Sequence, residues 1–396
     1  MGNNIDVVVV GGGYAGVMAA NRLAGRAGVT VTVINPRPVF VPRLRLHQLV
    51  GGTHEAVTDF ETVLADGVRL VVAAAERIDA TARRVILADG DSIGYDYLIY
   101  AIGSTDAAPV VPGAAEFAYP LATLESARRL RSVLDDTPVS AAVTVVGGGP
   151  TGIETAAELA EQGRPVTLVC GAELLPYLHA KARRTGRKYL TDLGVTIVAG
   201  PEAVVTAVTP HAVQLADGRT VDSRVTIWTA GFGVPDLAAR SGLRTDAAGR
   251  LLTDETLTSV DDERILAAGD CSAPSGVPFR MSAYAAGCLG AHAADTLTAR
   301  LTGDRPEPID LSLAAMCLSF GRRAGIFQIS RKDDTALPLY FPGRAGKKLK
   351  EFACRSSVAH LVTEASKPGS HHWPKDGKHR PTLLAAAHDE VAAPVV

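Results

Sequence analysis

IDVVVVGGGYAG, from Ile5 to Gly16, and VTVVGGGPTG, from Val143 to Gly152, are the stretches that decide the fold of this chain. Each joins an apolar run to spaced glycines and opens a segment with helical spacing. That order predicts a strand, a tight turn and a helix N-terminus, which is the phosphate-binding start of a Rossmann unit. Two such units in one chain predict two dinucleotides that meet face to face.

Each fingerprint assigns separate tasks to its glycines. The first permits the tight turn, the second lets the backbone approach a pyrophosphate, and the third lets the helix pack closely on the strand. The alternative of two ordinary glycine turns is weakened because the motifs occupy matched positions of an internal repeat. The predicted phosphate-binding residues are Gly11, Gly13, Tyr14, Ala15 and Gly16 in the first unit and Gly147, Gly149, Pro150, Thr151 and Gly152 in the second.

The repeat continues beyond the fingerprints. Each half has a β-branched strand, VTVTVIN and RPVTLVC, and closes on a buried strand, YDYLIYAIGS and VTIWTAGFG. Between them, RLVVAAAERIDA with RRVILADG and VTIVAG with HAVQLADG alternate as hairpins would. RILAAGD, at residues 264–270, is a further strand without a fingerprint. We expect it to return to the first sheet, which would make the second unit an insertion in the first.

The predicted fold class is therefore α/β, with two Rossmann-like dinucleotide-binding units, the second inserted into the first, and a small C-terminal region. In that region LSLAAMCLSFGRRAGIFQIS predicts one or two strands with a turn at Gly321–Gly325, and residues 343–365 predict a basic helix. The last segment, SKPGSHHWPKDGKHRPTLL, is polar and rich in Pro and Gly, which predicts low folding potential. His371 and His372 lie in it and are expected to contact solvent.

Composition excludes several function classes. The chain has 396 residues, a net charge of −2, 47% hydrophobic and 21% charged residues, so no broad attraction to nucleic acid is expected. The first strand begins near Ile5 and no apolar run reaches about 18 residues, which favours a cytoplasmic protein. The five cysteines are scattered without CxxC spacing, so we expect neither a disulfide framework nor a metal site.

The residues that should bind the adenosine ribose depart from the usual acid. Asn35 ends the second strand of the first unit and can still hydrogen-bond a ribose. Cys170 stands at the matching place in the second unit, where Glu173 could take over if the loop bends back. A 2′-phosphate would need a nearby base, and the nearest ones downstream are Lys181, Arg183 and Arg184. The pattern weakly favours NADH over NADPH as the cofactor of the second unit.

The order of GGGYAG, YLIYAIGS, GGGPTGIE, IWTAGF and ILAAGDCSA resembles the flavoproteins with two dinucleotide-binding domains, the pyridine nucleotide-disulfide oxidoreductase superfamily. Within it, GGGPTGIETAAELAE and VFVPRLRLHQLV are most similar to the type II NADH dehydrogenases and the apoptosis-inducing-factor-like NADH:quinone oxidoreductases. The resemblance implies FAD in a domain of residues 1–112 and 256–330 and NAD(P)H in a domain of residues 113–255. Residues 331–396 would form the C-terminal region.

The resemblance also assigns roles to single residues. Asp270, after Gly269, matches the acid that binds the flavin ribityl chain, against the alternative of a surface turn. Ser282 and Ala283 would begin a helix that faces the flavin. Further cofactor contacts are implied at Arg43, Arg45, Ala75, Ala101, Ile102, Gly103, Ala230 and Gly231.

Glu154 is the residue that we expect to act beside the reacting rings. It lies in the first turn of the second fingerprint helix, where an acid also suits the helix dipole without any other role. In the resembling quinone reductases the matching Glu lies by the nicotinamide and the flavin. His47 is a candidate for handling substrate protons. No CxxxxC is present, and all five cysteines are interpreted as small buried hydrophobes.

The sequence thus predicts an FAD-dependent NAD(P)H oxidoreductase that passes electrons to a quinone-like acceptor. The alternatives are a ferredoxin reductase, a tailoring oxidoreductase on a small organic molecule, and a redox-responsive FAD/NADH-binding signalling protein. The basic helix at residues 343–365 is a candidate for peripheral contact with the inner face of a membrane, against simple packing on the FAD domain. A monomer and a homodimer both fit the sequence.

Overall fold

A five-stranded parallel sheet surrounds the first fingerprint in the computed structural model, which describes residues 4–392. Its order is β21 (Ile265–Ala267), β9 (Tyr97–Tyr100), β1 (Ile5–Val10), β2 (Val29–Asn35) and β5 (Arg69–Val72). Helices α1 (Tyr14–Leu23) and α9 (Ala283–Thr302) pack together on one face. On the other face lies the small antiparallel sheet of β6 (Ala75–Asp79), β7 (Arg84–Leu87) and β8 (Ser92–Gly94).

A second parallel sheet surrounds the second fingerprint. Its order is β11 (Ala118–Pro120), β18 (Val225–Trp228), β12 (Val143–Val146), β13 (Val166–Val169) and β14 (Thr196–Val198). Its helices are α5 (Leu124–Asp135), α6 (Pro150–Glu161) and α7 (Ala180–Asp192), and β15 (Val205–Val208), β16 (Ala212–Leu215) and β17 (Thr220–Asp222) form an antiparallel sheet. Because β21 pairs with β9 in the first sheet, the predicted insertion of one unit in the other is confirmed.

Two of the expected hairpins have different partners. Arg69–Val72 joins the first parallel sheet, and only β6 and β7 form the hairpin. Thr196–Val198 likewise joins the second parallel sheet, and the hairpin partner of β16 is Val205–Val208. In both units the displaced strand extends a parallel sheet, so the tertiary pairing overrides the local alternation.

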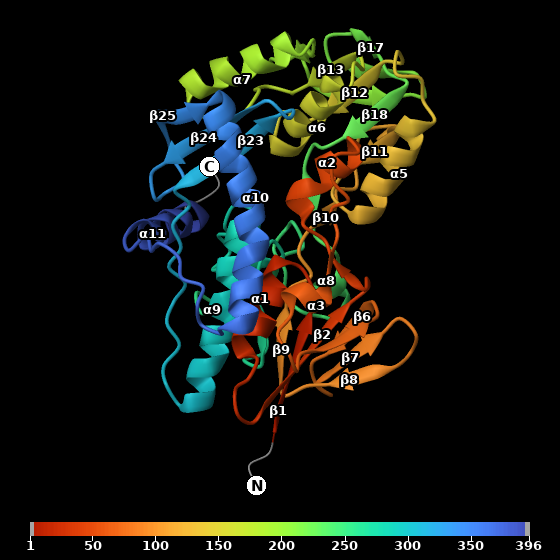
Figure 1. Ribbon diagram of the computed structural model, residues 1–396. Coiled ribbons are helices and arrows are strands. Elements are labelled where there is room, and N and C mark those ends of the chain that lie inside the picture. Colours follow the sequence, from red (N-terminus) through yellow and green to blue (C-terminus); the bar gives the residue numbers. More distant parts are fainter. Residues whose placement is uncertain (1–3, 393–396) are drawn as a thin grey trace.

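The C-terminal region is a sheet crossed by one long helix. Strands β23 (Ala315–Phe320), β24 (Ala324–Ser330) and β25 (Ala336–Pro342) are antiparallel, so the predicted strand pair gains a third member. Helix α10 (Gly343–Ser366) lies across this sheet and continues down beside α1, as Figure 1 shows. The low folding potential predicted for the last segment is wrong: helix α11 (His379–Ala392) begins within it, and His371 and Arg380 are buried.

Short elements connect these parts. The two-stranded pairs are β3 (Val39–Phe40) with β4 (Thr58–Asp59), β10 (Thr105–Asp106) with β19 (Phe232–Gly233), and β20 (Leu251–Thr253) with β22 (Ser272–Pro274). The short helices are α2 (Leu46–Val50), α3 (Phe60–Val63), α4 (Ala114–Phe117), α8 (Leu237–Arg240) and the 3-10 turn η1 (Arg43–Arg45). Within residues 4–392, no helix combines the length and apolarity that crossing a bilayer requires.

Candidate functional site

Both fingerprints adopt the same local geometry. At Gly11 and Gly147 φ is +107° and +129°, a conformation that side chains disfavour. A Cβ at Gly16 would collide with the carbonyl oxygen of Gly11, and one at Gly152 with that of Gly147. A Cβ at the middle glycine, Gly13 or Gly149, would meet nothing within 4 Å. The outer glycines are thus required by the fold, while the middle ones leave the open cradle that a pyrophosphate needs.

One cavity of about 1440 Å³ joins the two units and the C-terminal region. Most of the residues predicted from the sequence line it together: Gly11, Gly13, Tyr14, Ala15, Asn35, Arg43, Ala75, Ala101, Ile102, Gly103, Pro150, Thr151, Glu154, Gly231, Gly269, Asp270, Ser282 and Ala283. The predicted residues outside its lining are Gly16, Arg45, Gly147, Gly149, Gly152, Glu173 and Ala230. Residues from both dinucleotide units therefore face a single space.

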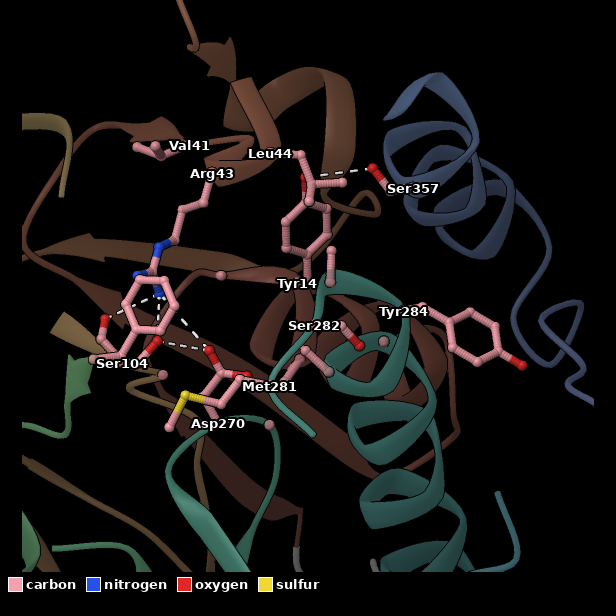
Figure 2. Close-up of a pocket in the computed structure, with 18 of the residues that line it drawn as sticks. Tyr14, Val41, Arg43, Leu44, Ser104, Asp270, Met281, Ser282, Tyr284 and Ser357 are labelled. Carbon is pink, nitrogen blue, oxygen red and sulfur yellow. Dashed lines mark hydrogen bonds and ion pairs between the residues drawn. The ribbon is translucent and has the colours of Figure 1, made fainter. Parts of the chain in front are cut away.

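A polar cluster lies at the end of the first sheet, as Figure 2 shows. Ser104 Oγ donates to Asp270 Oδ2 at 2.6 Å, and Arg43 Nη1 donates to Ser104 Oγ at 2.8 Å and to its carbonyl oxygen at 3.0 Å. Arg43 Nη1 lies 3.8 Å from Asp270 Oδ2, and its guanidinium stands over the ring of Phe232. Burial lowers the pKa of Arg43, and Asp270 opposes that shift. The cluster presents both charges to the cavity, where hydroxyl and phosphate groups of a dinucleotide could bind.

Asn35 and Arg45 serve mainly internal contacts. Asn35 Oδ1 accepts from the Gly12 N–H at 3.0 Å, and its Nδ2 donates to the Arg37 carbonyl at 2.8 Å, so its amide shapes the fingerprint loop. Arg45 donates to Glu351 of α10 at 2.7 and 2.8 Å and is buried away from the cavity. Asn35 thus stabilises the fingerprint loop, and Arg45 connects the η1 turn to α10.

The ribose corner of the second unit holds an ion pair. Arg183, from α7, lies against the Glu173 carboxylate, although nine residues of sequence separate the two positions. Burial raises the pKa of Cys170 to about 12, so its thiol stays neutral. The corner thus offers an acid for a ribose and a base for a 2′-phosphate, and the choice between NADH and NADPH stays a prediction.

Glu154 is the centre of a buried charge network. Its Oε1 accepts from the Ser319 N–H at 2.8 Å and Oγ at 2.9 Å, and Lys350 Nζ lies 3.1 Å away. Burial alone would raise the pKa of Glu154, but Lys350, His47 and Ser319 together lower it. Both Glu154 and Lys350 line the cavity, so an ionised pair stands at the junction of the two units.

His47 completes this network. Its Nδ1 lies 3.6 Å from Glu154 Oε2, and its buried Nε2 has no hydrogen-bond partner among residues 4–392. Burial lowers its pKa to about 4, a shift that Glu154 opposes and Lys350 reinforces. His47 is among the residues that line the cavity, and its imidazole is neutral with one buried nitrogen left without a partner.

Three buried histidines make the free energy of unfolding depend on pH. The pKa values of His47, His292 and His371 are lowered to about 4 by burial, below the usual value near 6.5. Between these values the unfolded chain binds more protons, so stability is complete above about pH 6.5 and falls toward pH 4. Each histidine adds a slope of at most about 1.4 kcal/mol per pH unit, approached near pH 5 and vanishing above about pH 7. We expect His292→Gln to remove one such slope in urea unfolding at pH 5, 6 and 7; an unchanged slope would contradict this.

The cysteines form no disulfide in the described part of the chain. Cys271, Cys288 and Cys354 are buried, and burial raises the pKa of all five thiols, to about 11 for Cys317. Cys317 and Cys354 line the cavity as neutral thiols. Their surroundings agree with the interpretation as small hydrophobes.

Sequence reasoning missed Ser104, Ser319 and Lys350. Ser104 follows the Ala101–Gly103 turn, and that position was a usable signal. Lys350 and Ser319 come from α10 and β23, far from Glu154 in the sequence, and no local pattern marks them. Of the two tail histidines expected in solvent, His372 is exposed and His371 is buried, so that expectation is wrong for His371.

Known proteins resemble this chain along most of its length. A family model described as pyridine nucleotide-disulphide oxidoreductase matches residues 5–287. An NADH dehydrogenase-like protein of Mycobacterium tuberculosis is 34% identical over 67% of this chain and 72% of the relative. The type II NADH:quinone oxidoreductase of the same organism is 28% identical, covering 76% of this chain and 73% of the relative.

The solved structure of NDH2 from Plasmodium falciparum in complex with NADH superimposes with a TM-score of 0.75. It is 15% identical and covers 94% of this chain and 99% of that one, so it supports the fold alone. The predicted family resemblance and the predicted fold class are confirmed. The residues matched by the family model include both glycine fingerprints. The chain therefore belongs to the pyridine nucleotide-disulphide oxidoreductase family.

Proposed function

We propose that this protein is an FAD-dependent NAD(P)H oxidoreductase that delivers electrons to a quinone-like acceptor. The observation that carries the proposal is the single cavity lined by both fingerprint units, from Gly13 to Thr151. FAD fits the first unit, where the open cradle at Gly13 leads to Asp270, and NAD(P)H fits the second. The named relatives are NADH dehydrogenase-like proteins and NADH:quinone oxidoreductases, which supports the quinone.

The residues of this chain bind, orient and handle protons. Bound in the first unit, FAD would supply the redox chemistry that links hydride from NAD(P)H to an electron acceptor. Asp270, Ser104 and Arg43 would hold the polar chain of the cofactor, and the first turn of α9 at Ser282 would offer backbone N–H groups to developing negative charge. Glu154, kept ionised by Lys350, and neutral His47 also line the cavity and can accept or relay a proton there.

Contact with a membrane and the oligomeric state stay predictions. In favour of the contact, α10 carries Phe352, which is 68% exposed, beside the exposed basic residues Lys348 and Arg355. Leu339 and Phe341 of the adjoining strand β25 are also exposed. An apolar surface with basic neighbours suits the interface of an anionic bilayer.

The purified protein is expected to be yellow and to bleach with NADH or NADPH under anaerobic conditions. Stopped-flow reoxidation should then be many times faster with a quinone than with ferredoxin or oxygen. The membrane contact can be tested in the same preparation if a long-chain quinone is supplied in anionic liposomes. Flotation then measures how much of the enzyme binds to these liposomes. A colourless protein that cannot be reconstituted with FAD would end the proposal. Faster reoxidation by ferredoxin would show that the acceptor is an iron–sulfur protein and not a quinone, while the assignment as a flavoprotein would stand.

A further inference from the structure

The segment that follows α10, residues 367–392, is fastened to the body of the protein and is called the C-terminal strap below. Its first anchor is Glu364, whose carboxylate is fully buried. It accepts from the Gly369 N–H at 2.6 Å, the His371 N–H at 2.7 Å and the Ser370 Oγ at 3.1 Å. These bonds turn the chain back toward α9.

Asp310 is the second anchor of the strap. Its carboxylate accepts from the Asp376 N–H at 2.6 Å and the Gly377 N–H at 3.0 Å. Its backbone carbonyl accepts from the indole N–H of Trp373 at 2.9 Å. The path of the strap is thereby fixed up to α11.

Arg380, at the start of α11, is the third anchor and is 6% exposed. Its guanidinium donates to both Glu255 oxygens at 2.9 Å, to the Val277 carbonyl at 2.7 Å and to the Pro274 carbonyl at 2.9 Å. It also stands 4.5 Å over the ring of Phe279. One side chain thus bonds both ends of the turn at residues 274–277.

That turn has a backbone conformation that needs support. Ser275 has φ +51° and Gly276 φ +72°. The left-handed region is unfavourable for a serine and persists where the surroundings enforce it. The carbonyls that Arg380 bonds belong to Pro274 and Val277, which flank these two residues directly.

The turn leads straight into the cavity wall. Residues 278–282 line the cavity, and Ser282 caps α9 by accepting from the Ala285 N–H at 3.1 Å. Arg280 is tied on the other side to Asp334, with Nη2 2.9 Å from Oδ1. Figure 2 shows Met281 and Ser282 on the same side of the cavity as Asp270. The position of the turn therefore sets the position of this wall.

We propose that Arg380 is a positioning residue for the flavin. From the C-terminal strap it holds Ser275 and Gly276 in the left-handed turn, so that residues 278–282 and the first turn of α9 stand where FAD meets them. The inference rests on the proposed function, because FAD is the group to be positioned. Arg380 itself lies outside the cavity lining and acts through the loop.

Arg380→Gln tests the proposal in the full-length protein. We expect the FAD dissociation constant, measured by flavin fluorescence, to rise about tenfold, because charged hydrogen bonds to a carboxylate and two carbonyls are lost. KM for NAD(P)H should stay unchanged. Arg380→Lys keeps the charge but cannot bond all these groups at once, so it should lie between wild type and Arg380→Gln. Arg305→Gln removes the same charge from an exposed position and is the matched control.

A second substitution separates positioning from simple tethering. Ser275→Gly relieves the left-handed strain, so Arg380→Gln/Ser275→Gly should recover most of the lost FAD affinity. If the double variant binds FAD as weakly as Arg380→Gln, or if Arg380→Gln binds it like wild type, the proposal is overturned.

Hydrogen exchange gives a reading that does not depend on flavin. In FAD-free protein, Arg380→Gln should speed exchange of the Ser275 and Gly276 amides, which bond Thr253 and Ala273 in the closed turn. Unchanged exchange would overturn the proposal even in a preparation that binds FAD. A wild-type protein that binds no FAD would instead remove the proposed function.

Discussion

Replacing Lys350 with methionine is expected to lower the free energy of unfolding by about 3–5 kcal/mol, because it leaves the Glu154 carboxylate buried without its counter-charge. Lys350 and Glu154 are each about 5% exposed, and Lys350 Nζ lies 3.1 Å from Glu154 Oε1. Urea unfolding at neutral pH measures the loss. Lys348→Met, on the exposed side of the same helix, is the control and should change stability by less than about 0.5 kcal/mol.

The double variant Lys350→Met/Glu154→Gln distinguishes a lost charge pair from a lost side-chain volume. A neutral amide at position 154 keeps an oxygen for the Ser319 donors, so most of the stability should return. Because Lys350 lowers the pKa of Glu154 against the opposing effect of burial, Lys350→Met alone should shift the acid limb of the activity profile to higher pH. Equal instability of the single and double variants would show that the ion pair is not the cause.

Gly149→Ala and Gly152→Ala are expected to impair different properties, nucleotide binding in the first case and stability in the second. A Cβ at position 152 collides with the Gly147 carbonyl, so Gly152→Ala should destabilise the second unit by several kcal/mol even without nucleotide. A Cβ at position 149 meets nothing within 4 Å, so Gly149→Ala should leave stability within about 0.5 kcal/mol. It should nevertheless raise KM for NAD(P)H more than about tenfold, by filling the pyrophosphate cradle.

Thermal unfolding, FAD content and NAD(P)H titration of the two variants check this contrast. FAD binding should survive in Gly149→Ala, because the first fingerprint is untouched. Gly13→Ala is the matched variant in the first unit, since its Cβ also enters open space. It should reduce FAD binding and leave stability intact. A Gly149→Ala enzyme with wild-type KM would show that the nucleotide does not use this cradle.

The parts that could be predicted from the sequence depend on short-range patterns. The spacing of Gly11, Gly13 and Gly16 requires a particular turn, and the apolar run before it requires a buried strand. RILAAGD predicts one more buried strand, and its pairing with β9 follows from the topology of an inserted unit. Helix α10 is also recognisable, because basic and apolar residues alternate at helical spacing over residues 343–365.

Other features depend on contacts between residues that are distant in the chain. The tail that looked unfolded is ordered by Glu364, Asp310 and Glu255, each of which satisfies polar groups of the strap. The composition of this segment indicates that it can bury little apolar surface by itself. It contains no information about hydrogen-bond partners in other parts of the chain. Thr196–Val198 is a strand as predicted, but it pairs with β13 across helix α7 and not with the strand expected as its hairpin partner, because local alternation does not reveal a crossover pairing.

By itself, the sequence determined two dinucleotide cradles, because the backbone at Gly11 and Gly147 and the close packing at Gly16 and Gly152 allow no other residue type. The tertiary structure alone decided what surrounds them. It brought Lys350 and Ser319 to Glu154, Arg183 to Glu173, and Arg380 to the turn beside the cavity. Buried charges and strained turns need partners, and in this fold those partners come from segments that only folding places within hydrogen-bond distance.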